Sequence, residues 1–136
     1  MSIVFFEDTS WKNFVPLSYT RSLSDIKIGS LTTFEHFNLK SAKFLTRQYL
    51  EKVTIQRHPN CNVIEYNNDD IIINSLFIPH KSFLEKWNAK KEFLISFRGK
   101  ILMGRLKKSS FEYLYESVVH DKEIRPNKLS TEIIEM

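Results

Sequence analysis

The sequence predicts an α/β domain of three layers, with helices on both faces of a mainly parallel sheet. Two short apolar runs, residues 3–6 and 71–73, are bounded by acidic or amide side chains, as is typical of strands that are buried on both faces. Segments with apolar residues three and four positions apart separate and follow these runs, which indicates amphipathic helices. This alternation favours parallel strands joined by helical connections.

The first strand is predicted over residues 3–6, after which the chain reaches Glu7 and Asp8. Ligands of open α/β sheets bind beyond the carboxyl ends of such strands, so we expect these two acids at the ligand edge of the sheet. Residues 9–19 show no clear periodicity, and Pro16 would break a helix there. We therefore expect an ordered loop that its aromatic side chains hold in place.

The first helix is predicted from three apolar positions, spaced three residues apart: Leu31, Phe34 and Phe37. Ser30 is expected to be its N-cap, and Thr32 with Glu35 has the spacing of a capping box. A second strand is predicted over residues 42–45, and Thr46 is expected to cap a helix that ends before Pro59.

The second half of the chain predicts a strand over residues 69–74 and an amphipathic helix over residues 80–89. Residues 93–97 and 101–106 are strand-like and lie three residues apart, a length that suits a hairpin. Ser109 or Ser110 is expected to cap a last helix, whose apolar positions are Phe111, Leu114, Tyr115 and Val118. Beyond Lys122 the sequence gives no clear prediction of an element.

Composition indicates one domain over residues 1–136, since 42% of the residues are hydrophobic and the length suits a single core. Cys61 is the only cysteine, so an intrachain disulfide is excluded and a reducing compartment is favoured. No apolar run reaches the roughly 18 residues of a membrane helix, and the N-terminus is unlike a secretory signal. We expect a cytoplasmic protein. A net charge of +4 permits an anionic ligand without requiring one.

Several common chemistries are unfavoured by the residues present. Gly29, Gly99 and Gly104 lie too far apart to form a glycine-rich phosphate loop. The four histidines and Cys61 lack metal-binding spacing, and there is no nucleophile elbow of the hydrolase type. Lysines and arginines surround the predicted hairpin, but solvated surface charges explain them better than nucleic-acid binding does.

A polar segment ahead of the first helix is the best candidate for a phosphate site. Thr20, Arg21, Asp25 and Lys27 precede the helix start, where two cations and free backbone N–H groups would suit a phosphate. The alternative is a surface ion pair between Arg21 and Asp25, which is common and weak.

The same segment resembles the N-terminal part of an alternative bacterial family of sugar nucleotidyltransferases. Members open with a strand, an acidic pair, a Pro-Leu-Thr-x-Thr-Arg-Pro-like segment, Asp-Leu-Arg-x-Gly and a Thr-x-x-Glu helix. The matching residues are Glu7, Asp8, Pro16, Leu17, Thr20, Arg21, Asp25, Gly29, Thr32 and Glu35. Further matches are Thr46, Tyr49, Leu50, Asn74, Pro79, Arg105 and Leu106. Departures are Ser18, Ser22, Ile26, Lys27 and Leu76, and Lys27 lacks the planar fork that binds phosphate bidentately.

The resemblance implies a nucleotidyltransferase-like, Rossmann-like fold with a C-terminal hairpin, and it implies roles for named residues. It suggests a catalytic set of Arg21, Asp25 and Lys27. It suggests nucleotide or phosphate binding by Thr20, Arg21, Gly29, Ser30 and Asn74. It implies Mg²⁺ held by Asp8 and Asp25, with Asp70 a weaker third candidate because it precedes its strand.

The matching domain is the pyrophosphorylase-like domain of bifunctional UDP-N-acetylglucosamine diphosphorylases. Longer members join this domain to a left-handed β-helix acyltransferase, and 136 residues leave no room for that second domain. The resemblance implies a protein that binds a nucleotide or nucleotide sugar and, if it is an active enzyme, a sugar-1-phosphate nucleotidyltransferase. The alternative is a catalytically inactive relative that serves as a binding or assembly module. Because the sugar-binding half would be small, we expect a twofold dimer or a partner protein, with Trp11 or Tyr113 at the interface.

Overall fold

A six-stranded sheet forms the centre of the domain in the computed structural model, which describes residues 2–37, 42–88, 91–129 and 133–136. In spatial order its strands are β4 (Lys43–Leu45), β1 (Ile3–Phe6), β5 (Ile71–Asn74), β7 (Lys100–Arg105), β6 (Phe93–Phe97) and β8 (Ile133–Glu135). β1 is parallel to β4 and β5, and β6 is parallel to β8. β7 pairs antiparallel with β5 and β6. The predicted mainly parallel sheet with a hairpin is confirmed.

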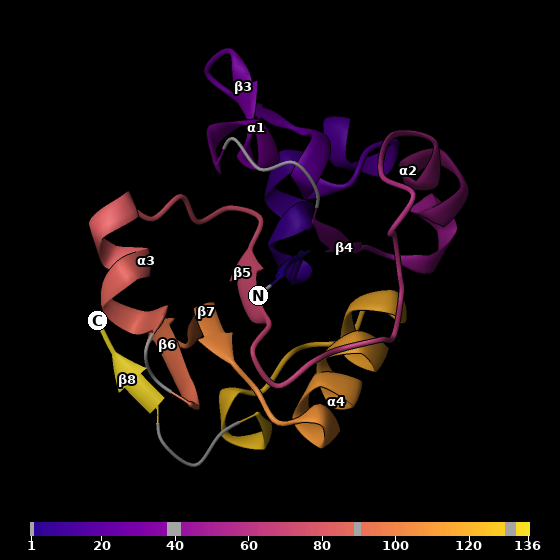
Figure 1. The fold of residues 1–136 in the computed structure, drawn as a ribbon. Coiled ribbons are helices and arrows are strands. Elements are labelled where there is room, and N and C mark those ends of the chain that lie inside the picture. Colours follow the sequence, from indigo (N-terminus) through magenta and orange to yellow (C-terminus); the bar gives the residue numbers. More distant parts are fainter. Residues whose placement is uncertain (1, 38–41, 89–90, 130–132) are drawn as a thin grey trace.

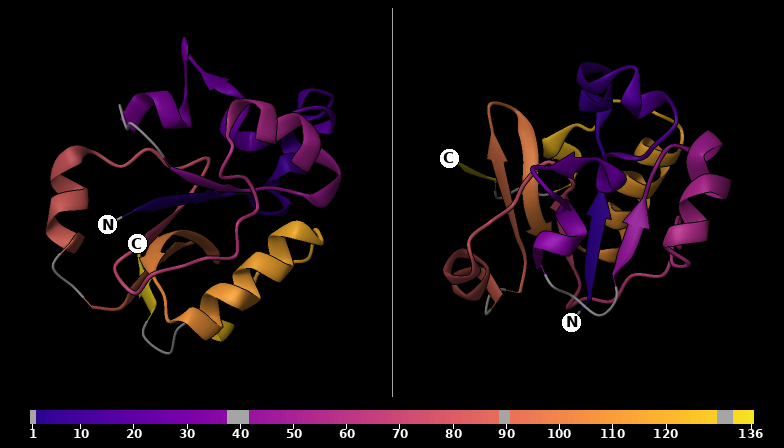
Figure 2. Two further views of the ribbon diagram at one scale, coloured as in Figure 1. Left: turned by 45° about the vertical axis from the view of Figure 1, so that its right-hand side comes forward. Right: turned by 90° about the horizontal axis from the view of Figure 1, so that it is seen from above.

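Helices lie on both faces of this sheet, which gives the three predicted layers (Figures 1 and 2). The α-helices are α1 (Thr33–Phe37), α2 (Glu51–Arg57), α3 (Lys81–Asn88) and α4 (Lys108–Val119). Short 3-10 turns are η1 (Thr9–Phe14), η2 (Leu17–Tyr19), η3 (Leu23–Asp25), η4 (Gln48–Leu50) and η5 (Pro126–Lys128). Among the described residues, no helix is long and apolar enough to cross a membrane.

The core is divided by the sheet because neighbouring side chains of a strand point to opposite faces. Val4 of β1 belongs to the apolar cluster beneath α4, which includes Phe111. Phe5 belongs to the cluster on the other face, where its ring lies 6.3 Å from that of Phe34 in α1, measured between centroids. Phe83 of α3 packs against the same cluster. The buried run of β1 therefore holds the two outer layers together.

One predicted capping motif is confirmed near α1, and two predicted helix caps differ in the structure. Thr32 and Glu35 do form the predicted capping box, since each backbone N–H donates to the other's side chain at 3.3 Å. Ser30 is not the cap, because β2 (Lys27–Ile28) and β3 (Leu31–Thr32) form a small hairpin before α1. Thr46 donates its hydroxyl to Glu7 instead of capping a helix.

The other differences concern the last third of the chain and the first loop. α4 begins at Lys108, so Ser109 and Ser110 lie in its first turn and do not cap it. β8 was not predicted, and it pairs with β6 at the edge of the sheet. The segment over residues 9–19 contains η1 and η2, and the rings of Trp11 and Tyr19 contact each other there, as the aromatic content suggested.

Cys61 is buried and free. Burial, together with the nearby carboxylates of Glu51, Asp25 and Glu7, raises the pKa of its thiol to about 12. The thiol is therefore neutral at physiological pH and acts as a small apolar side chain.

Candidate functional site

The candidate site lies where β1, β4 and β5 end, at one edge of the sheet that we call the carboxyl edge. Glu7 and Asp8 follow β1, Thr46 and Arg47 follow β4, and Asn74 closes β5. The loop with η1 and η2 covers this edge, as the right-hand view of Figure 2 shows beyond the tips of β1 and β4. Parallel pairing brings these polar residues together, as the sequence predicted for Glu7 and Asp8.

Glu7 and Arg47 form a buried ion pair at the centre of the carboxyl edge. The Oε1 atom of Glu7 accepts from the backbone N–H of Arg47 at 3.0 Å and from its Nε at 3.1 Å. The Thr46 hydroxyl donates to the same oxygen, and the Leu23 N–H donates to Oε2 at 3.0 Å. Only 2% of Glu7 and 1% of Arg47 is exposed, so neither charge is solvated and each depends on the other.

The Arg47 guanidinium also fixes the loop that covers the edge. Its Nη2 donates to the carbonyl of Ser18 at 2.7 Å and to that of Arg21 at 3.3 Å. Its Nη1 donates to the hydroxyl of Tyr49 at 2.6 Å. The guanidinium carbon lies 4.1 Å from the ring centroid of Trp11, a cation–π distance. Each guanidinium nitrogen is therefore satisfied within the protein.

Thr20 and Arg21 are exposed on this loop. Thr20 donates its hydroxyl to the carbonyl of Leu17 at 3.4 Å. The backbone carbonyl of Arg21 is held by Arg47, whereas its guanidinium makes no hydrogen bond or ion pair within the described residues. Arg21 thus presents an available cation on a fixed backbone.

Asp25 is buried and bonds to His58, not to Arg21. Its Oδ1 lies 2.7 Å from Nε2 of His58, and its Oδ2 accepts from the Ser22 hydroxyl at 3.3 Å. The His58 ring stacks on Phe44 with centroids 3.8 Å apart. The alternative of a surface ion pair between Arg21 and Asp25 is therefore wrong. As the structure has it, the Asp25 carboxylate anchors η3.

Lys27, Gly29 and Ser30 lie on the β2–β3 hairpin, which projects at the top of Figure 1. All three residues are exposed, and Gly29 has a φ of 75°, which suits glycine in a tight turn. In the sequence, the β2–β3 hairpin lies between the segment that carries Arg21, residues 18–23, and the start of α1. The structure therefore does not place these three residues at a helix N-terminus with Arg21, and their roles in phosphate binding stay predictions.

Asp8 and Asn74 meet beside a pocket of about 240 Å³. The Asn74 amide donates to Oδ2 of Asp8 at 3.1 Å, and the other oxygen of Asp8 caps η1 through the Ser10 N–H at 2.9 Å. Lys100, the first residue of β7, donates to the Ser10 hydroxyl. The pocket is lined by Asp8, Ser10, Asn74, Leu76, Phe77, Phe97, Arg98, Lys100 and Leu102. Its lining combines apolar side chains with one carboxylate and two cations.

The acidic residues do not gather into a metal centre by themselves. Among the described residues, no group of three or more His, Cys, Asp or Glu side chains is arranged to hold a metal ion. Asp8 and Asp25 bond to different partners, Asn74 and His58. Asp70 lies where β5 begins, at the opposite edge, and accepts from the Ser2 N–H at 3.0 Å. Of the three predicted ligands, Asp8 alone borders the pocket.

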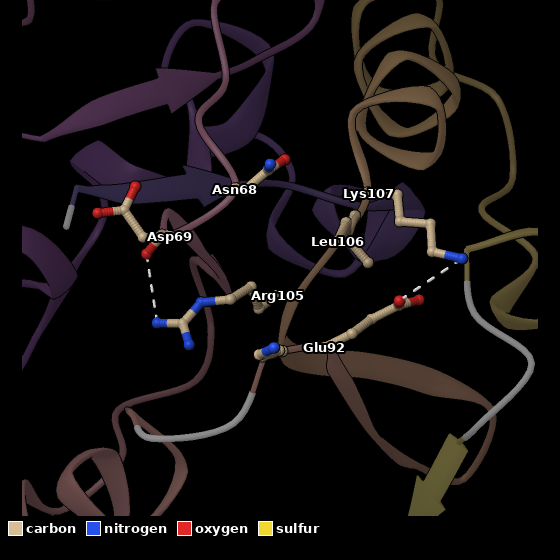
Figure 3. A pocket seen from close by; sticks show the side chains of 7 residues that line it. Asn68, Asp69, Glu92, Arg105, Leu106 and Lys107 are labelled. Atoms are coloured by element: carbon tan, nitrogen blue, oxygen red, sulfur yellow. Dashed lines mark hydrogen bonds and ion pairs between the residues drawn. The ribbon is translucent and has the colours of Figure 1, made fainter.

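A second hollow of about 450 Å³ lies at that opposite edge, where β7 ends (Figure 3). Two of its cations have partners close by: Arg105 donates to the carbonyl of Asp69 at 3.2 Å, and Lys107 lies 3.8 Å from Glu92. Because ligands of open α/β sheets bind beyond the carboxyl ends of the parallel strands, here β1, β4 and β5, the candidate site is the other edge.

A family model described as sugar nucleotidyl transferase matches residues 3–135 of the chain. The chain belongs to this family. The resemblance seen in the sequence is therefore confirmed, and the layered α/β fold fits it. No curated protein and no solved structure matches the chain.

Sequence reasoning missed the residues that fix the candidate site. Arg47 bonds to an acid 40 positions away in the sequence, and His58 bonds to one 33 positions away. No local sequence pattern therefore identifies either residue. One signal was available for Arg47, because it is the second residue after a predicted buried strand and a charged residue there lies at the carboxyl edge.

Proposed function

We propose that this chain binds a nucleotide or nucleotide sugar at the carboxyl edge, with the phosphates on residues 20–21. The exposed guanidinium of Arg21, on a backbone that Arg47 holds at 3.3 Å, carries this proposal. A planar guanidinium binds phosphate oxygens bidentately, and a fixed backbone lowers the entropy lost on binding. Membership of the sugar nucleotidyl transferase family supports the class of ligand.

The pocket beside Asp8 would hold another part of the same ligand. Its apolar side chains suit a sugar or base ring, and Arg98 and Lys100 add positive charge. Mg²⁺, which the resemblance implies, would be held by Asp8 together with phosphate oxygens of the ligand, because Mg²⁺ needs only one or two carboxylates. Asp25 fits this role less well, because its carboxylate is bonded to His58. The ion would neutralise charge during transfer of the nucleotidyl group.

A catalytically inactive relative is the second candidate function. Its support is that Asp25 anchors η3 through His58, which leaves Asp8 as the one predicted metal ligand beside the pocket. Such a protein would bind the same ligands without turning them over. Release of pyrophosphate from UTP and a sugar 1-phosphate, measured with Mg²⁺ present, distinguishes the two: release supports the enzyme, and binding without release supports the inactive relative.

The Arg21→Ala variant tests the ligand proposal. UTP, other nucleoside triphosphates and UDP-N-acetylglucosamine, each with Mg²⁺, should raise the melting temperature of the wild type, since a ligand at 100 times its Kd adds about 2.7 kcal/mol of stability. Arg21→Ala should remove nearly all of this shift at the same ligand concentration and leave the melting temperature without ligand nearly unchanged, because the side chain is exposed.

Lys107→Ala is the matched control, because Lys107 is an exposed cation at the opposite edge of the sheet, where β7 ends. It should keep the full ligand shift. An undiminished shift in Arg21→Ala would contradict the proposal, and loss of folding in that variant would show that Arg21 is structural.

We also infer that the chain works as an oligomer, most simply a twofold dimer. The side chains expected at an interface, Trp11 and Tyr113, are half-buried. Tyr19, which contacts the Trp11 ring, and Tyr49, which bonds to Arg47, are 57% and 60% exposed. Exposed aromatic side chains are enriched at interfaces. Light scattering after size exclusion should give the mass of a dimer. A monomer that releases pyrophosphate from UTP and a sugar 1-phosphate would overturn this inference.

A further inference from the structure

Two buried side chains hold the backbone on both sides of Arg21. Arg47 donates to the carbonyls of Ser18 and Arg21, at 2.7 and 3.3 Å. On the other side, Oε2 of Glu7 accepts from the N–H of Leu23 at 3.0 Å. Since Glu7 and Arg47 are joined to each other, one rigid unit fixes three points of a segment only six residues long, 18–23.

We infer that Arg47 is a positioning residue for ligand binding, and that it acts through Arg21. This inference rests on the proposed function. Arg47 is 1% exposed and each of its guanidinium nitrogens donates within the protein, so it does not itself contact a phosphate. It sets where the Arg21 guanidinium stands, and a misplaced cation loses the bidentate geometry that phosphate binding requires.

The Arg47→Lys variant separates positioning from charge. A lysine keeps the positive charge beside Glu7 but lacks the planar guanidinium, in which Nε bonds to Glu7 while Nη2 donates to the carbonyls of Ser18 and Arg21. We expect the Kd for UTP, measured by calorimetry at a temperature where circular dichroism shows the variant fully folded, to rise about tenfold or more. Lys43→Met is the matched control, because it breaks an ion pair with Asp70 at the opposite edge of the sheet, and its Kd for UTP should stay at the wild-type value.

The double variant Arg21→Ala/Arg47→Lys gives the readout that a merely structural role would not move. If Arg47 acts through Arg21, the double variant binds UTP no more weakly than Arg21→Ala does, because the second change has nothing left to misplace. If the two losses add, Arg47 acts on the ligand by another route and the inference is overturned.

The failures of the two proposals are distinguishable. Wild-type affinity in Arg21→Ala overturns the proposed function and the inference with it. Weak binding in Arg21→Ala together with wild-type affinity in Arg47→Lys overturns the inference alone.

Should Arg47→Lys not fold, Trp11→Leu replaces it, because this change removes the ring that lies 4.1 Å from the Arg47 guanidinium and spares the ion pair. We expect a smaller rise in Kd that again vanishes in the Arg21→Ala background, and wild-type affinity would overturn the inference.

Discussion

The Ile72→Asp variant should fail to fold. Ile72 lies in β5, is 0% exposed, and pairs with Val4 of β1 on one side and Gly104 of β7 on the other. An aspartate there would place an unpaired charge in the apolar cluster beneath α4. The penalty for an uncompensated buried charge is several kcal/mol, which is comparable to the about 5–15 kcal/mol by which domains are stable. Circular dichroism should show loss of native structure and no cooperative melting.

Ile55→Asp is the matched control, because Ile55 lies on α2 and is 44% exposed. Its free energy of unfolding should stay within about 0.5 kcal/mol of the wild type. A native spectrum and a cooperative transition in Ile72→Asp would contradict the placement of β5 at the centre of the sheet.

The strands that could be predicted are those whose own residues show that the strand is buried. β1 and β5 are buried on both faces, so an unbroken apolar run is enough to identify them. The Thr32–Glu35 capping box was also predictable, because both partners lie within one turn of helix. Local patterns therefore gave the layers and the edge at which ligands are expected.

The elements that escaped prediction are short or weakly patterned. β2 and β3 have two residues each, too few to show an alternation of buried and exposed positions. β8 has three residues, and Ile133 at its start is 38% exposed, so its place in the sheet comes from backbone pairing with β6. A pairing that depends on a partner strand leaves little trace in the strand itself.

The candidate site could be predicted only in part, because its charges find partners far along the chain. The exposed Arg21 and the Asp8–Asn74 contact lie at the edge that the strands indicated. The partner of Asp25 could not be read from its neighbours, since Arg21 is four residues away and His58 is 33. Burial decided the choice, because a carboxylate that is 6% exposed must be bonded within the protein.

Removing the Arg47 charge should destabilise the domain strongly. Arg47→Met would leave Glu7 buried without its counter-ion and the Ser18 carbonyl without a donor. Breaking one partner of a buried pair typically costs about 3–5 kcal/mol. Glu7→Gln alone should also destabilise, because it leaves the Arg47 cation unpaired. Urea unfolding of the two single variants and of the double variant measures each effect.

The sign of the Glu7→Gln effect in the two backgrounds identifies the pair as the cause. With Arg47 present the change removes a needed anion and lowers the free energy of unfolding; in the Arg47→Met background it removes an uncompensated charge, so the double variant should be more stable than Arg47→Met alone. Lys107→Met is the exposed control, because its partner Glu92 lies 3.8 Å away and the lysine is 74% exposed. That change should cost less than about 1 kcal/mol. Equal losses from Glu7→Gln in both backgrounds would mean that the carboxylate serves the Leu23 and Thr46 donors and not the Arg47 cation.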